Sequence, residues 1–355
     1  MYVSSIFLTI FILVFFGGVV AVIRHLSRKQ KEEAISDILI AGGFELIIAS
    51  FGTFDDKLFA FLSGTQANIN YVQLGIGLLL LMGGIFFFFY VKNKLYILNI
   101  NGYYDKRVEQ HHQDLGLNAF QFKERDIDFI RTFRKGMSAE TAEDIQEEFK
   151  NKIPAFISES QDKSRAYTGI APIPFIFVAG KMFARERIDK YFEYNKFEQT
   201  YYELATNKKR RKPYESLRPV TALSSIPSSS TVDVVLAISI TQHIPNADLT
   251  QFPYPIVHLA IPNPADNAIK YTNQLKEYTS AIYDMLIAIG NHYPKVKRIH
   301  LAYAGQSCLA FEVGKLLDDQ RIKEIISYWY DTQNTIRYPW GIVINGQRKG
   351  TYIEA

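Results

Sequence analysis

The fold is decided by residues 169–204, which read GIAPIPFIFVAGKMFARERIDKYFEYNKFEQTYYEL, and by residues 303–338, which read YAGQSCLAFEVGKLLDDQRIKEIISYWYDTQNTIRY, because the second stretch repeats the first. The two align without a gap at an offset of 134 residues. Seven positions are identical, where unrelated segments would share about two. The identical pairs are Phe177/Phe311, Gly180/Gly314, Lys181/Lys315, Arg187/Arg321, Ile188/Ile322, Tyr194/Tyr328 and Gln199/Gln333. The repeat predicts two similar structural units.

Short apolar runs alternate with amphipathic runs on both sides of the repeat, which is typical of an α/β protein. The predicted elements are strands at 232–240, 256–261 and 296–303, helices at 139–157, 266–289 and 309–317, and a C-terminal hairpin of two aromatic strands at 322–330 and 337–344. We therefore expect two Rossmann-like lobes, residues 95–230 and 231–355. A charged, Ser/Pro-rich stretch at 207–230 separates them.

The first 94 residues have a different pattern, which predicts an α-helical transmembrane module. Residues 3–23 contain no charged side chain and residues 72–91 form a second apolar run of spanning length. Between them, residues 38–54 are apolar apart from Glu45. Three crossings place the basic residues at 24–31 and at 92–94 on the cytoplasmic side, as the positive-inside tendency favours. A re-entrant or interfacial second segment is the alternative.

Glu45 is the predicted functional residue of this module, because a carboxylate at bilayer depth costs several kcal/mol unless it is neutral, partnered or facing water. Glycine pairs at 17–18, 42–43 and 83–84 would allow helices to approach closely in an oligomer. The alternative is that Glu45 lies near the membrane interface.

Charge and cysteine content exclude several classes of function. Of the 40 basic and 36 acidic residues, five and six fall within 1–91, which leaves 35 and 30 in the remaining 264. So small a surplus predicts no binding of duplex nucleic acid, although a pocket for a small anion is compatible with it. The single cysteine, Cys308, excludes an intramolecular disulfide and a thiolate zinc cluster. We predict no metal site and no cofactor.

The predicted ligand site lies where parallel strands end and lead into helices, because that edge of an α/β sheet offers unpaired N–H groups to anions. The loops GIAPIP and AGQS occupy this place in the two lobes, and SITQHI ends a third strand. The hairpin adds Tyr338 as a residue that would stack on a base. The candidate ligand-binding residues are Thr168, Gly169, Pro172, Thr241, Gln242, His243, Gly305, Gln306, Ser307 and Tyr338.

The C-terminal block resembles a known family. It runs from a strand (KRIHLAYAG, 297–305) to a helix (LAFEVGKLL, 309–317) and an aromatic hairpin (ISYWYDTQNTIRYPWGIVIN, 326–345). This order, together with the duplication, resembles the SAVED domain, a fusion of two CARF-like lobes found in the bacterial anti-phage signalling systems called CBASS. The resemblance covers roughly residues 100–350, and the apolar N-terminal module resembles that of transmembrane SAVED effectors.

The resemblance implies a function. A partner nucleotidyltransferase would make a cyclic di- or trinucleotide, which the SAVED domain would bind. The chain would then form a homo-oligomer and disrupt the bilayer of the bacterial inner membrane, which it would cross several times with its C-terminal domain in the cytoplasm. Catalysis is not predicted, because the sequence contains no HExxH, GxSxG or GxxxxGK[ST] motif. The alternatives are a membrane-anchored α/β enzyme acting on a nucleotide or lipid, and a membrane scaffold protein.

Overall fold

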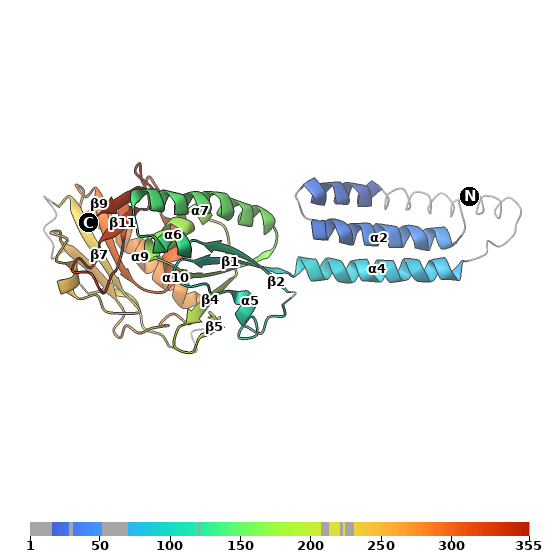
Figure 1. Ribbon diagram of the computed structural model, residues 1–355, viewed down its shortest axis with the longest axis horizontal. Helices are drawn as coiled ribbons and strands as arrows, with labels where there is room; N and C mark the ends of the chain where they lie inside the picture. Colours follow the sequence, from blue (N-terminus) through green and yellow to red (C-terminus); the bar gives the residue numbers. More distant parts are fainter. Residues whose placement is uncertain are drawn as a thin grey trace, which may run out of the picture. The chain divides into compact units, whose positions relative to one another are not determined.

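The structure is a computed structural model that describes residues 16–27, 31–51, 70–119, 121–206, 213–220, 223 and 231–354. The chain divides into two compact units, Met1–Lys94 and Leu95–Ala355. The first unit is helical and the second is built on two β-sheets. Figure 1 shows both units.

The N-terminal unit contains a short helix, Phe16–Ser27, followed by α2 (Lys31–Ser50) and α4 (Tyr71–Lys92). Helices α2 and α4 lie side by side (Figure 1), and glycines set their close approach. A Cβ added at Gly43 would lie 2.5 Å from Leu81 N, and one at Gly84 would lie 2.8 Å from Ile40 N. The glycines therefore permit backbone contact between the two helices.

Of the described residues, only α4 forms a helix that is long and apolar enough to cross a membrane. It matches the predicted span at 72–91. The predicted span at 38–54 falls mostly within α2, which begins earlier, at Lys31, and carries Glu33, Asp37 and Glu45; residues 52–54 lie outside the described part. Most of the predicted span at 3–23 is also outside it, and three crossings therefore remain a prediction.

The first sheet of the second unit has the strand order β2-β1-β3-β4-β5. Its first four strands are parallel, and β5 pairs antiparallel with β4. The strands are β1 (Leu95–Asn101), β2 (Phe122–Asp128), β3 (Ser164–Ile170), β4 (Lys190–Asn195) and β5 (Thr200–Glu203). The helices are α5 (Val108–His111), α6 (Ile130–Arg134), α7 (Ala139–Glu159) and α8 (Ile173–Phe183). Helix α7 covers one face of the sheet and α5 lies on the other (Figure 1).

The second sheet has the strand order β12-β11-β10-β9-β7-β8-β6. Its strands are β6 (Arg218–Pro219), β7 (Asp233–Ser239), β8 (Ile256–Ala260), β9 (Arg298–Ala304), β10 (Glu324–Trp329), β11 (Trp340–Val343) and β12 (Tyr352–Glu354). Its helices are the 3-10 turn η3 (Asn246–Leu249), α9 (Thr272–His292) and α10 (Ser307–Leu316). The order β8-β7-β9-β10-β11 reproduces that of the whole first sheet, which confirms the duplication predicted from the repeat.

The predicted elements of this unit differ from the structure by one or two residues at their ends, except for two that differ by more. The helix predicted at 266–289 begins only at Thr272, because the residues before it are held by other contacts: Ala205 pairs with Tyr271, and the Ile269 backbone bonds to a side chain of another loop. The hairpin strands β10 and β11 pair antiparallel as predicted. Strand β11 starts at Trp340, after Pro339, which has no N–H to donate to a ladder.

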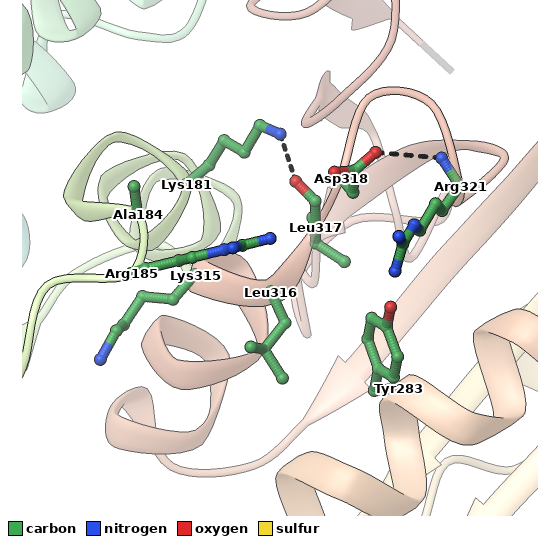
Figure 2. A pocket seen from close by; sticks show the side chains of 9 residues that line it. All are labelled: Lys181, Ala184, Arg185, Tyr283, Lys315, Leu316, Leu317, Asp318 and Arg321. Atoms are coloured by element: carbon green, nitrogen blue, oxygen red, sulfur yellow. Dashed lines mark hydrogen bonds between the residues drawn. The ribbon is translucent and has the colours of Figure 1, made fainter.

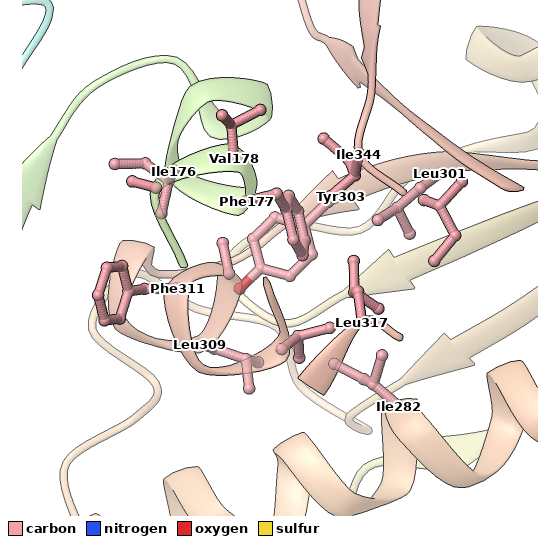
Figure 3. Packing of buried hydrophobic residues seen from close by; sticks show 14 of the residues in the cluster. Ile176, Phe177, Val178, Ile282, Leu301, Tyr303, Leu309, Phe311, Leu317 and Ile344 are labelled. Atoms are coloured by element: carbon pink, nitrogen blue, oxygen red, sulfur yellow. The ribbon is translucent and has the colours of Figure 1, made fainter. Parts of the chain in front are cut away.

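The two lobes pack through equivalent helices of the repeat, α8 and α10. A Cβ at Gly314 would lie 2.5 Å from Phe177 O, and a Cβ at Gly180 would overlap Phe311 O. Around this contact Phe177 meets Tyr303 edge-on, with ring centroids 5.5 Å apart. Figure 3 shows these side chains within one buried cluster that joins the lobes. The α/β part is therefore a single body with a shared core.

Candidate functional site

A cavity of about 170 Å³ opens at the carboxyl ends of β7 and β9. Five of the predicted ligand-binding residues line it: Thr241, Gln242, His243, Gly305 and Tyr338. The backbone N–H groups of Ile240 and Thr241 both donate to Ala304 O, at 2.8 and 3.0 Å, so the loop after β7 turns across the end of β9. Residues paired between these two strands are 65 positions apart in the sequence, as Asp233 and Arg298 are, yet the ends of both strands lead to one cavity.

A buried polar network lies beside His243, an exposed residue of the cavity lining. Its ring stacks on that of His258, with centroids 5.5 Å apart. His258 Nε2 lies 2.8 Å from Ser239 Oγ, which also accepts a hydrogen bond of 2.9 Å from Ile244 N. Burial, and then the neighbouring His243, lower the pKa of His258. A neutral His258 is the form that accepts the Ser239 hydroxyl proton at Nε2.

The opposite wall is aromatic and includes residues that the sequence did not single out. The Tyr330 hydroxyl donates a hydrogen bond of 2.9 Å to Asp248 Oδ2. The ring centroids of Tyr330 and Tyr338 are 5.3 Å apart. Gln251 exchanges two hydrogen bonds of 2.9 Å with the backbone of Tyr338. The Tyr338 side chain is only 1% exposed. It therefore forms the floor of the cavity, and Tyr330 is the more accessible ring.

Gln306 and Ser307, also predicted in the site, direct their side chains between the lobes. The Gln306 amide donates to Tyr202 Oη at 2.9 Å and accepts from Ile269 N at 2.5 Å. The Ser307 hydroxyl donates a long hydrogen bond, 3.4 Å, to Glu193 Oε1. Both residues are buried. Their contacts hold the loop after β9 in place, and their part in binding remains a prediction.

Glu193 occupies the position where the loop after β9 was expected to hold an anion. Its carboxylate accepts a hydrogen bond of 2.9 Å from Cys308 N, at the start of α10. It comes from β4 of the first lobe, and burial raises its pKa. In the repeat its counterpart is Ser327, so the one signal in the sequence is an acidic residue where the other copy has a hydroxyl. A side chain of the protein thus fills this helix N-terminus.

The corresponding edge of the first lobe is closed by aromatic side chains. Trp329 donates its indole N–H to Tyr103 Oη at 2.8 Å. The ring centroid of Trp340 lies 5.8 Å from that of Phe175, in the first turn of α8. The predicted residues of this edge are Thr168 and Gly169, at the end of β3, and Pro172, just before α8. Thr168 is buried, with 1% of its surface exposed. A Cβ added at Gly169 would contact the Tyr167 hydroxyl, and the Pro172 ring lies close to Gly102. None of the three lines the cavity of the second lobe.

The described residues contain no group of three or more His, Cys, Asp or Glu side chains that could hold a metal ion. Cys308 is buried at the start of α10, and burial raises the pKa of its thiol well above the ordinary value. A protonated, inaccessible thiol is a poor nucleophile.

Residues 145–344, more than half of the chain, match the family model described as "SMODS-associated and fused to various effectors sensor domain". The chain belongs to the SAVED family. The matched part of the SAVED domain runs from within α7 to the end of β11 and includes every residue that lines the cavity. No curated protein matches the chain.

Several solved receptors are similar in fold. A Cap4 SAVED/CARF-domain receptor of Acinetobacter baumannii with the cyclic trinucleotide 3′3′3′-cAAA is 13% identical, with a TM-score of 0.49 over 92% of this chain and 64% of the receptor. The same receptor with 2′3′3′-cAAA is 12% identical, with a TM-score of 0.47 over 91% and 64%. The Cap4 receptor of Moraxella osloensis is 13% identical, with a TM-score of 0.43 over 89% and 76%. The chain spans about two thirds of the length of the Acinetobacter receptor.

Proposed function

We propose that this protein is a membrane-bound sensor that binds a cyclic oligonucleotide in the cavity at the ends of β7 and β9. The observation that carries the proposal is this cavity, which lies within the matched part of a family described as a sensor domain. The loop after β7 supplies hydroxyl, amide and imidazole groups, and the hairpin supplies two phenol rings. Such a mixture of hydrogen-bonding groups and rings is suited to a nucleobase.

In the proposed complex one base enters the cavity and the rest of the ligand lies across its rim. Tyr330 and His243 face the base with their rings, and Thr241 and Gln242 bond to its polar edge. The His243 ring stacks on His258, whose own ring is held by the hydrogen bond to Ser239, so that less side-chain entropy would be lost on binding. Cyclic trinucleotides are the first ligands to test, since the similar Acinetobacter receptor has been solved with two of them.

The N-terminal helices are the proposed effector part. Gly18, Gly43 and Gly84 are used in contacts within this unit, whereas a Cβ at Gly17, Gly42 or Gly83 would meet nothing within 4 Å among the described residues. Helix α4, which contains Gly83, also exposes large apolar side chains such as Leu79, Met82 and Phe86. We infer that ligand binding favours an assembled state in which helices of several chains pack together and disrupt the bilayer. A partner nucleotidyltransferase would supply the ligand.

The test is isothermal titration of the full chain, purified in detergent, with a panel of cyclic di- and trinucleotides. One member should bind in a saturable way, and His243→Ala should weaken that binding about tenfold or more. His292→Ala, at the end of α9 and outside the cavity, is the matched control and should bind as the wild type does. The absence of binding by every member of the panel, or equal loss in both variants, would overturn the proposed site.

A further inference from the structure

We propose that the α/β unit has a second anion site, for a small phosphate compound, at the end of the molecule where α8 and α10 finish. A cavity of about 300 Å³ lies there, lined by Lys181, Arg185, Lys315 and Arg321, with Asp318 as its one acidic side chain. The proposed nucleotide cavity lies at the start of α10, whose 10 residues separate the two places by about 15 Å. The second site is therefore distinct from the first.

Two of the four cations are already engaged by protein groups. Lys181 Nζ donates to Leu317 O, an end carbonyl of α10, and pairs with Asp319 Oδ1 at 2.8 Å. Lys315 Nζ pairs with Glu312 Oε1 at 2.7 Å. These lysines complement the partial negative charge of the helix C-termini, which would otherwise repel an anion. Their roles are structural.

The two arginines are different, because neither forms an ion pair with any residue in the described part of the chain. Figure 2 shows the guanidinium groups of Arg185 and Arg321 directed into the cavity from opposite sides, with the Tyr283 hydroxyl facing Arg321. Asp318 forms no ion pair with Arg321, since its carboxylate instead accepts the backbone N–H groups of Gln320 and Arg321, at 2.7 and 3.0 Å.

Arg185, which is exposed like Arg321, follows a turn of unusual backbone conformation. Ala184, the residue after α8, has a φ of 54°, a region that favours glycine. This turn ends the helix and carries Arg185 to the cavity wall. Two planar guanidinium forks and a phenol hydroxyl present more donors than a carboxylate can accept, whereas a phosphate or pyrophosphate offers enough oxygens for all three. Phosphate chemistry is therefore the ligand class that fits.

The repeat itself provides the control. Arg187 is the counterpart of Arg321 in the first lobe, yet its side chain is 84% exposed, pairs with Asp189 and lies outside the cavity. Removing either charge changes the net charge of the protein equally, but only one removes a donor from the proposed site. Arg321→Lys keeps the charge and loses the fork, so it separates recognition by geometry from attraction by charge.

The experiment is calorimetric titration of the full chain in detergent with sodium pyrophosphate at constant ionic strength, followed by ATP. Wild type should bind pyrophosphate, Arg185→Gln and Arg321→Gln should each weaken binding about tenfold, and Arg321→Lys should fall between. Arg187→Gln and His243→Ala should leave the affinity unchanged. Tighter binding of ATP than of pyrophosphate would identify a nucleotide as the occupant, and equal binding an isolated phosphate group.

Two results would overturn the second site: no heat of binding with pyrophosphate up to about 10 mM, or equal weakening in Arg187→Gln and Arg321→Gln. Loss of pyrophosphate binding in His243→Ala alone would assign the anion to the strand-edge cavity instead. Because cyclic-nucleotide binding is measured separately on His243→Ala, the two proposals can fail independently. Thermal melting of each variant excludes a loss of fold as the cause.

Discussion

The Glu193 carboxylate, on the fourth strand of the first lobe, accepts a hydrogen bond of 2.9 Å from the backbone N–H of Cys308, in the first turn of α10 of the second lobe. The two residues are 115 positions apart in the sequence. One side chain thus satisfies a helix N-terminus of the other lobe and ties the two sheets together. It also closes a place that a phosphate would otherwise enter.

Replacing Glu193 should therefore destabilise the whole α/β unit. We expect Glu193→Ala to lower the free energy of unfolding by about 2–4 kcal/mol, because Cys308 N–H and Ser307 lose their acceptor in a buried place. Glu193→Gln keeps one acceptor oxygen and should lose less than half as much. Chemical denaturation of the full chain measures both. Equal losses in the two variants would show that the hydrogen bond is not the cause.

The contact between α8 and α10 should tolerate no added methyl group. Gly180→Ala would drive a Cβ into Phe311 O and should cost about 2 kcal/mol or more. Gly290→Ala is the matched control: this glycine is also in a helix, α9, but a Cβ there would lie 3.7 Å from Lys323, an ordinary contact. The control should be neutral or stabilise by up to about 1 kcal/mol. Thermal melting compares the two, and similar melting temperatures would contradict the packing described.

Glu124 should make stability depend on pH. Its carboxylate accepts hydrogen bonds of 2.8 Å from Val108 N, Glu109 N and Asn99 Nδ2, but burial raises its pKa from 4.5 to about 7. The folded state then binds a proton that the unfolded state has already lost, so stability is lost as the pH rises from about 4.5 to about 7. The loss should be up to about 3 kcal/mol.

The measurement is the melting temperature of wild type and Glu124→Gln at pH 5 and pH 8. The variant cannot ionise at this position, so its melting temperature should fall less than that of the wild type between the two values. Its absolute stability is not the test, because the new amide also changes the hydrogen bonds to the α5 backbone. Parallel curves would show that Glu124 does not titrate in this range.

Glu45 tests the proposed effector role of the helices. It is half-buried in α2, whose other acidic residues lie nearer its start. If assembled helices form a polar path, Glu45→Gln should abolish ligand-triggered dye release from liposomes while cyclic-nucleotide affinity stays unchanged. Glu140→Gln, in the first turn of α7, removes the same charge outside the helical unit and should release dye as the wild type does. Undiminished release by Glu45→Gln would discard the role of this carboxylate.

The sequence predicts the α/β class, the duplication and half of the residues that line the strand-edge cavity, because these features depend on local periodicity. The run 232–240 is apolar at seven of its nine positions because it forms a strand buried on both faces, and its end marks the sheet edge wherever the strand lies. The prediction of Thr241, Gln242, His243 and Gly305 as neighbours followed from that rule alone. Tyr330 and Asp248 were missed, since nothing in a tyrosine of a hairpin distinguishes a cavity wall from a core.

The sequence also predicted two similar anion-binding loops, one in each lobe; the structure places side chains of the protein against both of them, and their part in binding stays a prediction. Whether a strand-end loop stays open depends on what the opposite lobe places against it, and those residues are distant in the chain. Glu193 fills one helix start, and its counterpart in the repeat is Ser327. Trp340 packs on Phe175 at the other helix start and stacks on Trp329, whose counterpart in the repeat is Asn195.

The amino-acid sequence by itself thus determined the repeated α/β lobes, the apolar α4 helix and the sheet edge at which the cavity-lining residues gather, because hydrophobic period and strand ends are local properties. The tertiary structure alone decided which sheet edge carries a cavity and which arginines line the cavity at the ends of α8 and α10. Packing two lobes through Gly180 and Gly314 makes their environments unequal, since each lobe uses different side chains to cover the other.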